Sequence, residues 1–391
     1  MPATKPDGKR FYRPELDALR FIAFLLVFVC HILQDAGLGT VLGGTSPLIR
    51  SMERALSLIS EVGTYGVALF FLLSAYLITE LMLIEYARTG DFKVKDFYVR
   101  RILRIWPLYF ATIGLFIFLS WLDPVDFKLS AGRVIAFLAL SGNWYLIYRG
   151  NFPPEFGVLW SVSVEEQFYL LWPGIFTLGK RRGIVFACIL FPLISAATLA
   201  YLGVAGAGRV AAWMNSFVQF LFFAVGGGLA LMMNQRVPRW PVSARMALAG
   251  GGVAVWLITE ATTHIQQRDT VIHSAGLLIG IAGIALGTAA IFLSVLGIRA
   301  ELVPRWWRYL GKISYGLYVF HPLAIVGTER VMSVVAHSLH FHRTVMVLYK
   351  LACPVLALGV TIGAAAVSYR FLESPFLRLR RRFTVVASRP V

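Results

Sequence analysis

Two side chains that can do chemistry, Arg20 and His31, lie in the first strongly apolar stretch of the chain, RFIAFLLVFVCH. If this stretch is a helix, the residues between them make about three turns, so both side chains share one face, roughly 16 Å apart along the axis. In a membrane helix, such a face indicates a protein interior or a watery cavity. A neutral imidazole can take a proton near pH 7, so His31 is a candidate general base; the alternative is a hydrogen-bonded packing residue.

Three arginines, Arg100, Arg101 and Arg104, stand near the start of another apolar stretch, in FYVRRILRIWPLYF. Arg101 and Arg104 are three residues apart, so they share a helical face. Guanidinium groups offer forked donors to phosphate oxygens, and with Arg20 these arginines are candidates to bind an anionic cofactor at a cytoplasmic mouth. The alternative is that positive charge anchors a membrane helix at its cytoplasmic end.

Two adjacent acids, Glu165 and Glu166, lie in the apolar segment GVLWSVSVEEQFYLLWP. Ionised carboxylates are costly inside a membrane, so a partner or a raised pKa is expected for each. Glu165 is the candidate to support the charged form of His31 or to contact an acceptor hydroxyl, and a salt bridge to an arginine is the structural alternative. The sequence does not decide which of the two acids acts. Ser161, one helical turn before Glu165, is a candidate substrate contact.

Polar side chains recur near one-turn spacing in GKISYGLYVFHP, which places Ser314, Tyr318 and His321 along one helical face. These three are candidate substrate contacts, with interhelical hydrogen bonding as the alternative. Trp144 and Tyr145 precede the acidic segment on the predicted outer side. They are candidates to stack on a sugar ring, and an aromatic belt at the membrane interface is the alternative.

No metal site is expected. The run HSLHFHR at 337–343 holds three histidines, but neither a carboxylate nor a cysteine accompanies them, which favours a solvated loop. Cys30, Cys188 and Cys353 each lie alone in an apolar run. Their spacing matches neither a disulfide framework nor a zinc site.

Membrane helices must position these residues. The chain has 391 residues and is 58% hydrophobic, and segments of the roughly 17–25 residues that cross a bilayer recur from end to end. Only helices and closed barrels satisfy their backbone in lipid, and the alternation typical of barrel strands is missing. We therefore expect an all-α, polytopic transmembrane bundle of roughly ten spans, near residues 18–34, 63–85, 103–122, 160–178, 184–205, 213–233, 245–259, 274–298, 311–335 and 345–371.

The net charge of +17 does not indicate a nucleic-acid partner, because its placement follows the predicted membrane topology. With both termini cytoplasmic, 26 basic residues fall inside, 10 fall outside and Arg20 lies in the membrane, as the positive-inside rule requires. The apolar piece 133–148 is expected to be re-entrant or to stay in the outer leaflet. A full crossing there would move Lys180–Arg182 and the later basic loops outside.

Together these segments resemble the acyltransferase 3 family of bacterial membrane O-acyltransferases. The matching pieces run from Tyr12 to about Arg378 and are RPELDALRFIAFLLVFVCH, GVALFFLLSAYLIT, RRILRIWPLY, LWSVSVEEQFYLLWP, ISYGLYVFHP and YRFLESPF. The first has the arginine–ten–histidine spacing associated with the family, and the third has its RRxxR pattern. Ala75 departs from the family, which usually has glycine there.

The resemblance implies transfer of an acyl group, most often acetyl, from cytoplasmic acyl-CoA to a hydroxyl of a cell-surface polysaccharide or lipid-linked glycan. It places the enzyme in the bacterial cytoplasmic (inner) membrane as a multi-pass protein whose partners are acyl-CoA, the glycan acceptor and the lipid bilayer. The family's functional positions carry over to His31 and Glu165 as catalytic residues and to Arg20, Arg100, Arg101 and Arg104 as donor-binding residues. On this reading CoA phosphates bind the arginines, and the thioester arm follows the Arg20–His31 face.

Some members of the family carry a fused extracytoplasmic domain. We expect a single transmembrane domain over residues 1–391, with short cytoplasmic tails at 1–17 and 379–391 and no such fusion. The protein would then act alone or pass its acyl group to a separate extracytoplasmic transferase.

Other functions fit the same residues. A transporter or exporter of a glycan or lipid-linked substrate also has many spans with buried charges, although no repeat relates the two halves of this chain. Within the enzyme class, the acyl group could be succinyl and the acceptor a non-glycan such as a macrolide. Direct transfer and a transient acyl-histidine are both chemically feasible.

Overall fold

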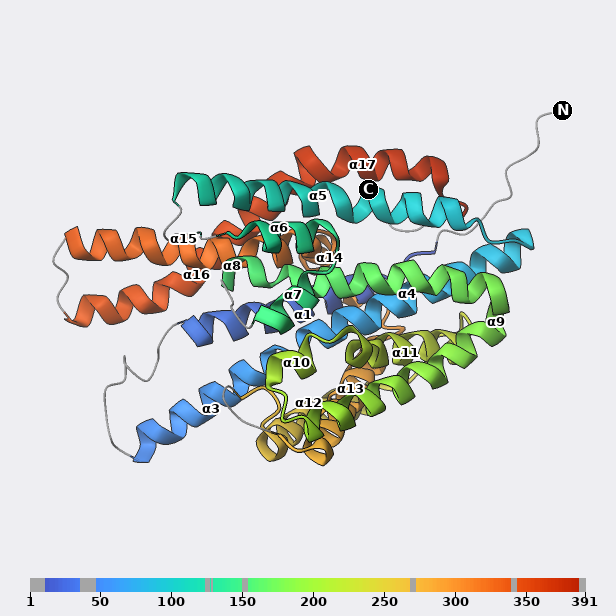
Figure 1. The fold of residues 1–391 in the computed structure, drawn as a ribbon, viewed down its shortest axis with the longest axis horizontal. Coiled ribbons are helices and arrows are strands. Elements are labelled where there is room, and N and C mark those ends of the chain that lie inside the picture. The colour runs from blue at the N-terminus through green and yellow to red at the C-terminus, as the bar shows by residue number, and fades with distance from the viewer. Residues whose placement is uncertain are drawn as a thin grey trace.

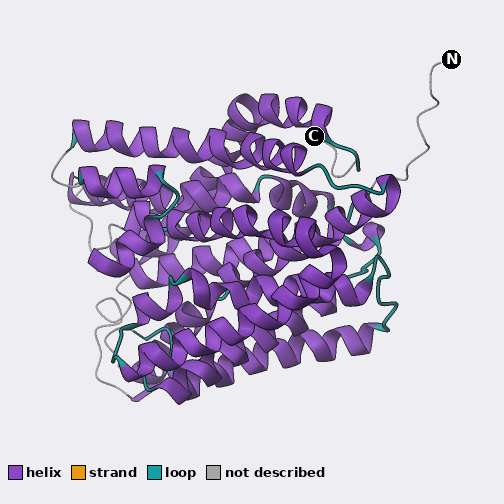
Figure 2. Ribbon diagram, turned by 45° about the vertical axis from the view of Figure 1, so that its right-hand side comes forward, coloured by secondary structure: helices purple, strands orange, loops and turns teal. Residues whose placement is uncertain are grey.

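The computed structural model describes residues 11–35, 47–123, 127, 129–149, 154–267, 272–338 and 343–386. The described part is almost entirely helical and contains no strand (Figure 2). The prediction of an all-α chain is confirmed.

The longer helices form a bundle whose axes run broadly along the long axis of the molecule (Figure 1). They are α1 (Pro14–Asp35), α3 (Pro47–Gly63), α4 (Gly66–Thr89), α5 (Val94–Leu122), α9 (Leu159–Val204), α11 (Ser216–Met233), α12 (Val242–Thr263), α13 (Ser274–Val295), α15 (Ser314–Ser338) and α16 (Arg343–Ser368). The shorter ones are α6 (Ala131–Leu138), α7 (Gly142–Arg149), α8 (Pro154–Gly157), α10 (Arg209–Trp213), α14 (Arg305–Lys312) and α17 (Ser374–Arg380), with η1 (Ala300–Leu302), η2 (Tyr369–Glu373) and η3 (Arg381–Phe383).

Nine helical stretches in the described residues are long and apolar enough to cross a membrane. Each of the ten predicted spans nevertheless coincides with helix over most of its length, and α9 accounts for two of them. A straight helix of its 46 residues would be roughly 69 Å long, about twice the hydrocarbon thickness. Its backbone leaves the helical region at Lys180 (φ 49°, ψ −133°), and the helix folds back there (Figure 1).

A glycine makes this reversal possible. The two halves of α9 approach so closely that a Cβ at Gly183 would lie 2.4 Å from the carbonyl oxygen of Ile175. Only a residue without a side chain fits that distance. The turn therefore separates residues 160–178 from 184–205, as the hydropathy pattern predicts.

Residues 133–148 do not form a spanning helix. They lie in α6 and α7, which have eight residues each and rise roughly 12 Å, far less than the hydrocarbon thickness. The amide of Asn143 donates to the carbonyl of Met214 at 3.0 Å and to the hydroxyl of Ser216 at 2.9 Å, which ties α7 to the start of α11. The re-entrant position of this segment stays a prediction.

Among the longer helices, the sequence pattern missed α3, which continues almost directly into α4. Its exposed face carries both apolar and charged side chains, so the segment is too polar to be recognised as a span. The hydroxyl of Ser60 donates to the carbonyl of Cys30 at 3.1 Å, so the end of α3 packs beside α1.

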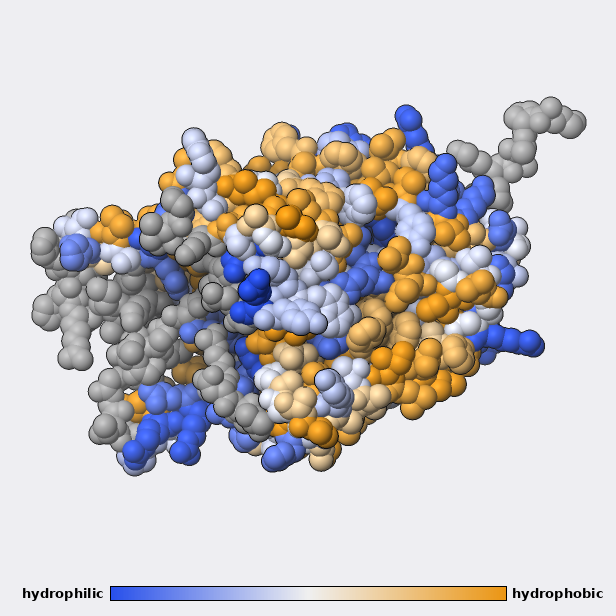
Figure 3. All heavy atoms as spheres, viewed as in Figure 1, coloured by the Kyte–Doolittle hydropathy of each residue, from blue (hydrophilic) through white to orange (hydrophobic). Residues whose placement is uncertain are grey.

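The outer surface suits a lipid environment. Large apolar side chains on α9 are exposed, among them Leu178 at 91% and Leu170 at 66%. Figure 3 shows broad hydrophobic areas along the side of the bundle and hydrophilic side chains at its right-hand end. We call that end, where α4 ends, α5 begins and α9 turns at Lys180, the basic end; the sequence predicts that it is cytoplasmic.

Candidate active site

A cavity of about 90 Å³ lies between α1, α4, α5, α9 and α15. Seven of the residues singled out in the sequence line it, although they come from four distant motifs: Arg20, Arg101, Arg104, Ser161, Glu165, Ser314 and Tyr318. The shared faces predicted for Arg101 with Arg104 and for Ser314 with Tyr318 are thus observed. Packing of the helices brings these polar clusters, which are distant in the sequence, together in one polar cavity inside an apolar bundle.

Arg20 is held in the cavity wall by an acid on its own helix. Its guanidinium donates to Asp17 at 3.2 Å, one turn earlier, and the hydroxyl of Tyr12 donates to the other oxygen of Asp17 at 3.0 Å. Asp17 is only 2% exposed. The charge of Arg20 is therefore partly balanced, and its orientation is fixed.

Arg101 is held by aromatic rings and makes no ion pair within the described residues. Its guanidinium carbon lies 5.2 Å from the ring centroid of Tyr169 and 5.5 Å from that of Phe97, and its buried Nε has no hydrogen-bond partner in the described part. Ring faces attract a cation without neutralising it. Arg101 therefore keeps its charge and donors for an anion in the cavity, with Arg104 one turn further along α5.

The two acids of α9 face different neighbours, as adjacent helical residues do. Glu165 lines the cavity and accepts hydrogen bonds from the hydroxyls of Ser74 and Tyr169. Glu166 accepts from the indole of Trp106 at 3.0 Å, on the α5 side. Of the two, Glu165 is the acid that a ligand in the cavity would meet.

His31 lies beyond the inner end of this cavity, next to His321. Their ring centroids are 4.9 Å apart. His321 is fully buried, and its ring centroid lies 5.7 Å from that of Tyr318. The hydroxyl of Tyr318 is in turn 2.7 Å from that of Ser161. A continuous series of polar groups thus joins His31 to the cavity lining.

The hydrogen bonds of the two imidazoles favour one tautomer. Nδ1 of His31 lies 2.8 Å from the carbonyl of Val27, and Nδ1 of His321 lies 2.7 Å from that of Tyr318. A carbonyl only accepts, so each Nδ1 carries the hydrogen when the ring is neutral. The lone pair that can take a proton is then on Nε2.

The face of α1 between Arg20 and His31 is not an open channel. Phe24 and Phe28 fill it and pack edge-on against His321, with ring centroids 5.9 and 6.4 Å away. These two rings occupy the face along which the thioester arm is expected from the sequence to run. The open space runs instead along α4, α5, α9 and α15.

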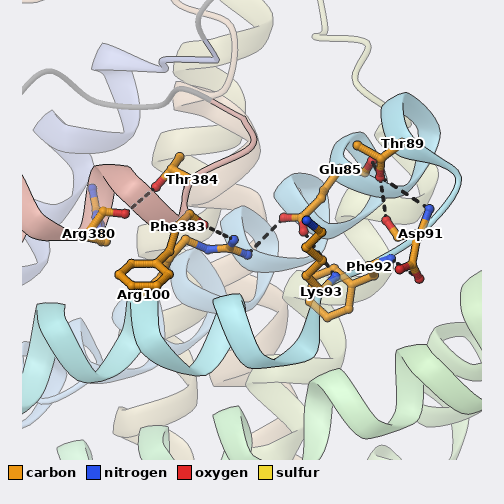
Figure 4. Close-up of polar contacts among 9 residues, drawn as sticks. All are labelled: Glu85, Thr89, Asp91, Phe92, Lys93, Arg100, Arg380, Phe383 and Thr384. Carbon is orange, nitrogen blue, oxygen red and sulfur yellow. Dashed lines mark hydrogen bonds and ion pairs between the residues drawn. The ribbon is translucent and has the colours of Figure 1, made fainter.

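Arg100 does not line this cavity. Its guanidinium donates to Glu85 at 3.0 Å and to the carbonyl of Phe383 at 2.8 Å, so it connects α5 with α4 and with the C-terminal segment (Figure 4). Arg100 therefore does not share this cavity with Arg101 and Arg104, with which the sequence grouped it.

Trp144 and Tyr145 are also outside the cavity lining. Trp144 packs on Phe217, with ring centroids 5.6 Å apart, and the hydroxyl of Tyr145 lies 2.8 Å from that of Ser130. Both belong to α7, and the structure does not bring them to the residues of the cavity.

Sequence reasoning missed Asp17, Ser74 and Tyr169. Asp17 stands three residues before Arg20 and Tyr169 four residues after Glu165, so helical spacing was the available signal for both. Ser74 lies in a quoted motif, but its contact with Glu165 crosses between helices and has no local signature. In the described residues, no group of three or more His, Cys, Asp or Glu side chains could hold a metal ion; His340 and His342 of the histidine run lie outside that part.

Comparison with known proteins shows which family this chain matches. A family model described as an acyltransferase domain matches residues 13–376. The chain is 25% identical over 395 residues to the peptidoglycan O-acetyltransferase OatA of Listeria monocytogenes, an alignment covering 94% of this chain and 56% of OatA. It is 26% identical over 386 residues to the Bacillus subtilis protein named "Putative peptidoglycan O-acetyltransferase YrhL", covering 93% and 55% of the two chains. The chain thus spans little more than half the length of these relatives. No solved structure matches it.

Proposed function

Since this chain belongs to the acyltransferase 3 family, we propose that it is an integral-membrane O-acyltransferase. It moves an acyl group, acetyl in the simplest case, from cytoplasmic acyl-CoA to a hydroxyl of a cell-surface polysaccharide or lipid-linked glycan. The observation that carries the proposal is the cavity in which Arg101 and Arg104 lie at one end and the Ser161–Tyr318 pair, adjoining the two histidines, lies at the other.

The arginines supply the donor site. The phosphates of CoA are anionic and bind best to guanidinium groups that are not already neutralised. Among the described residues nothing neutralises Arg101, and Arg20 and Arg104 line the same space. With the phosphates at these arginines, the flexible pantetheine arm extends towards Ser161 and Tyr318, away from the basic end.

The histidines supply the chemistry. His31 removes the proton from the acceptor hydroxyl through Nε2 while the hydroxyl oxygen attacks the thioester carbonyl. The tetrahedral intermediate then collapses: the carbon–sulfur bond breaks, and the CoA thiolate takes the proton back from the imidazolium. The products are the O-acyl ester and CoA. General base catalysis of this kind typically contributes 10²- to 10⁴-fold.

Glu165 positions the acceptor. Its carboxylate is oriented by the hydroxyls of Ser74 and Tyr169 and faces the cavity. A carboxylate fixed in this way accepts a hydrogen bond from a sugar hydroxyl and so aligns the attacking oxygen. The names of the relatives make peptidoglycan the first glycan to test as the acceptor, and the positive-inside pattern favours a bacterial inner membrane with the basic end in the cytoplasm.

The proposal is tested with purified full-length protein in proteoliposomes supplied with radiolabelled acetyl-CoA and either soluble peptidoglycan fragments or lipid-linked glycan precursors. The expected result is acceptor-dependent release of CoA together with label in the glycan as an alkali-labile ester. Movement of glycan across the bilayer without CoA release would show a transporter instead. Succinyl-CoA in parallel reactions identifies the acyl group.

A further inference from the structure

A second cavity lies at the basic end, next to the first. Its lining includes the C-terminal segment as well as α4 and α5. Arg101 lines both cavities, so they adjoin each other across its side chain. The polar and charged side chains of the second lining are Glu85, Arg100, Arg101, Arg380 and Thr384.

The C-terminal segment is docked in this place by specific contacts. Helix α17 lies beside α5 (Figure 1). The carbonyl of Phe383 accepts from Arg100 at 2.8 Å, and the hydroxyl of Thr384 donates to the carbonyl of Arg380 at 2.9 Å (Figure 4). Leu377 and Val386 are buried. Arg380 is thereby held at the cavity by the fold.

The charges of the second cavity are not balanced. Three arginines face one carboxylate, Glu85, and that carboxylate is already paired with Arg100 at 3.0 Å. Arg380 makes no ion pair in the described part of the chain. The side chain of Arg380 lies close to three other positive charges, those of Arg100, Arg101 and Arg104. The other arginines of this segment, Arg378, Arg381 and Arg382, are exposed. Positive groups gathered in this way create a site for an anion.

We propose that Arg380, together with Arg101, binds the 3′-phosphate of CoA, and that Arg100 holds the C-terminal segment in position for this contact. The proposal rests on the proposed function. CoA carries phosphate at two places: a diphosphate between the pantetheine arm and the ribose, and a 3′-phosphate on the far side of that ribose. Two adjoining basic cavities in series match this order, with the second one farther from His31.

The test uses the full-length protein in nanodiscs of phosphatidylcholine, with equilibrium binding of CoA and of 3′-dephospho-CoA. A hydrogen bond to a charged group is worth about tenfold or more in affinity. We therefore expect the wild type to bind CoA at least about tenfold more tightly than 3′-dephospho-CoA. Arg380→Ala should lose that preference by weakening CoA alone, and Arg380→Lys should retain part of it.

The exposed Arg378 on the same helix is the matched control, and Arg378→Ala should bind both nucleotides as the wild type does. Equal weakening of both nucleotides by Arg380→Ala would overturn the proposal, because Arg380 would then only support the fold. Unchanged binding of both would also overturn it. If adding phosphatidylglycerol to the nanodiscs abolishes the preference of the wild type for CoA, the site belongs to a lipid phosphate. If the wild type bound neither nucleotide, acyl-CoA would not be the donor. That result would contradict the proposed function and, with it, this proposal.

Discussion

Nδ1 of His31 lies 3.4 Å from Nε2 of His321, although 290 residues separate the two along the chain. The rings meet edge to face at 69°, and the packing of α1 against α15 fixes this geometry. His321 is fully buried between Phe24, Phe28 and Tyr318. It therefore limits the rotation of the His31 ring and links that ring to Tyr318 in the cavity wall.

This contact predicts that His321 acts through His31. Replacing His321 with Ala should lower kcat for acetyl transfer by about tenfold to a hundredfold, the range known for partners that orient metal-bound imidazoles. The Kd for CoA should stay within about twofold, because the arginines are untouched. Steady-state kinetics and CoA binding on the same preparation check this. A wild-type kcat in the variant would show that His321 only fills space.

The different surroundings of the two acids predict different effects of the same change. Glu165→Gln removes the charge that faces the cavity and should reduce turnover by at least about tenfold, since the aligned acceptor contact is lost. Glu166→Gln keeps an acceptor for the indole of Trp106 and should stay within about threefold of the wild type. The measurement is kcat/KM for the acceptor at saturating acetyl-CoA. Equal effects of the two changes would contradict the assignment of Glu165 to the site.

Arg101 has no ionic partner among the described residues, which predicts a binding defect when it is replaced. Arg101→Ala should raise the Kd for CoA by about tenfold or more, and added salt should weaken wild-type binding by screening the phosphates. Lys95→Ala removes an exposed charge from the start of the same helix and serves as the control. An equal loss in both variants would indicate a general electrostatic effect and not a site.

The turn in α9 gives a test of the fold that is independent of activity. In Gly183→Ala the new Cβ meets the carbonyl of Ile175, so we expect a loss of about 1–3 kcal/mol in stability. At Gly179, on the other side of the same turn, a Cβ would have no neighbour within 4 Å, and Gly179→Ala should be neutral or slightly stabilising. Thermal unfolding in detergent compares the two, and a neutral Gly183→Ala would contradict the close approach.

Much of this architecture could be predicted because its signals are local. Apolar runs indicated the spans, and a short basic stretch at Lys180 separated the two halves of α9. Three-residue spacing placed Arg101 and Arg104 on one face, and both line the cavity. The same logic failed for α3, whose mixed polarity hides it from a search for spans.

The relationships between helices could not be predicted, since they depend on packing between distant segments. Nothing near Arg100 in the sequence distinguishes it from Arg101, yet Glu85 and the carbonyl of Phe383 engage the first and leave the second available. Likewise, Phe24 and Phe28 looked like ordinary apolar residues. Only the position of His321 against them shows that the Arg20–His31 face is closed.

The most direct test of the whole account is acetyl transfer by His31→Ala. The purified variant should bind CoA with wild-type affinity but transfer radiolabelled acetyl groups to the glycan at least about a hundredfold more slowly, because the general base is gone. The exposed His273 provides the control, and His273→Ala should transfer at the wild-type rate. Transfer at the wild-type rate by His31→Ala would contradict the account at its centre.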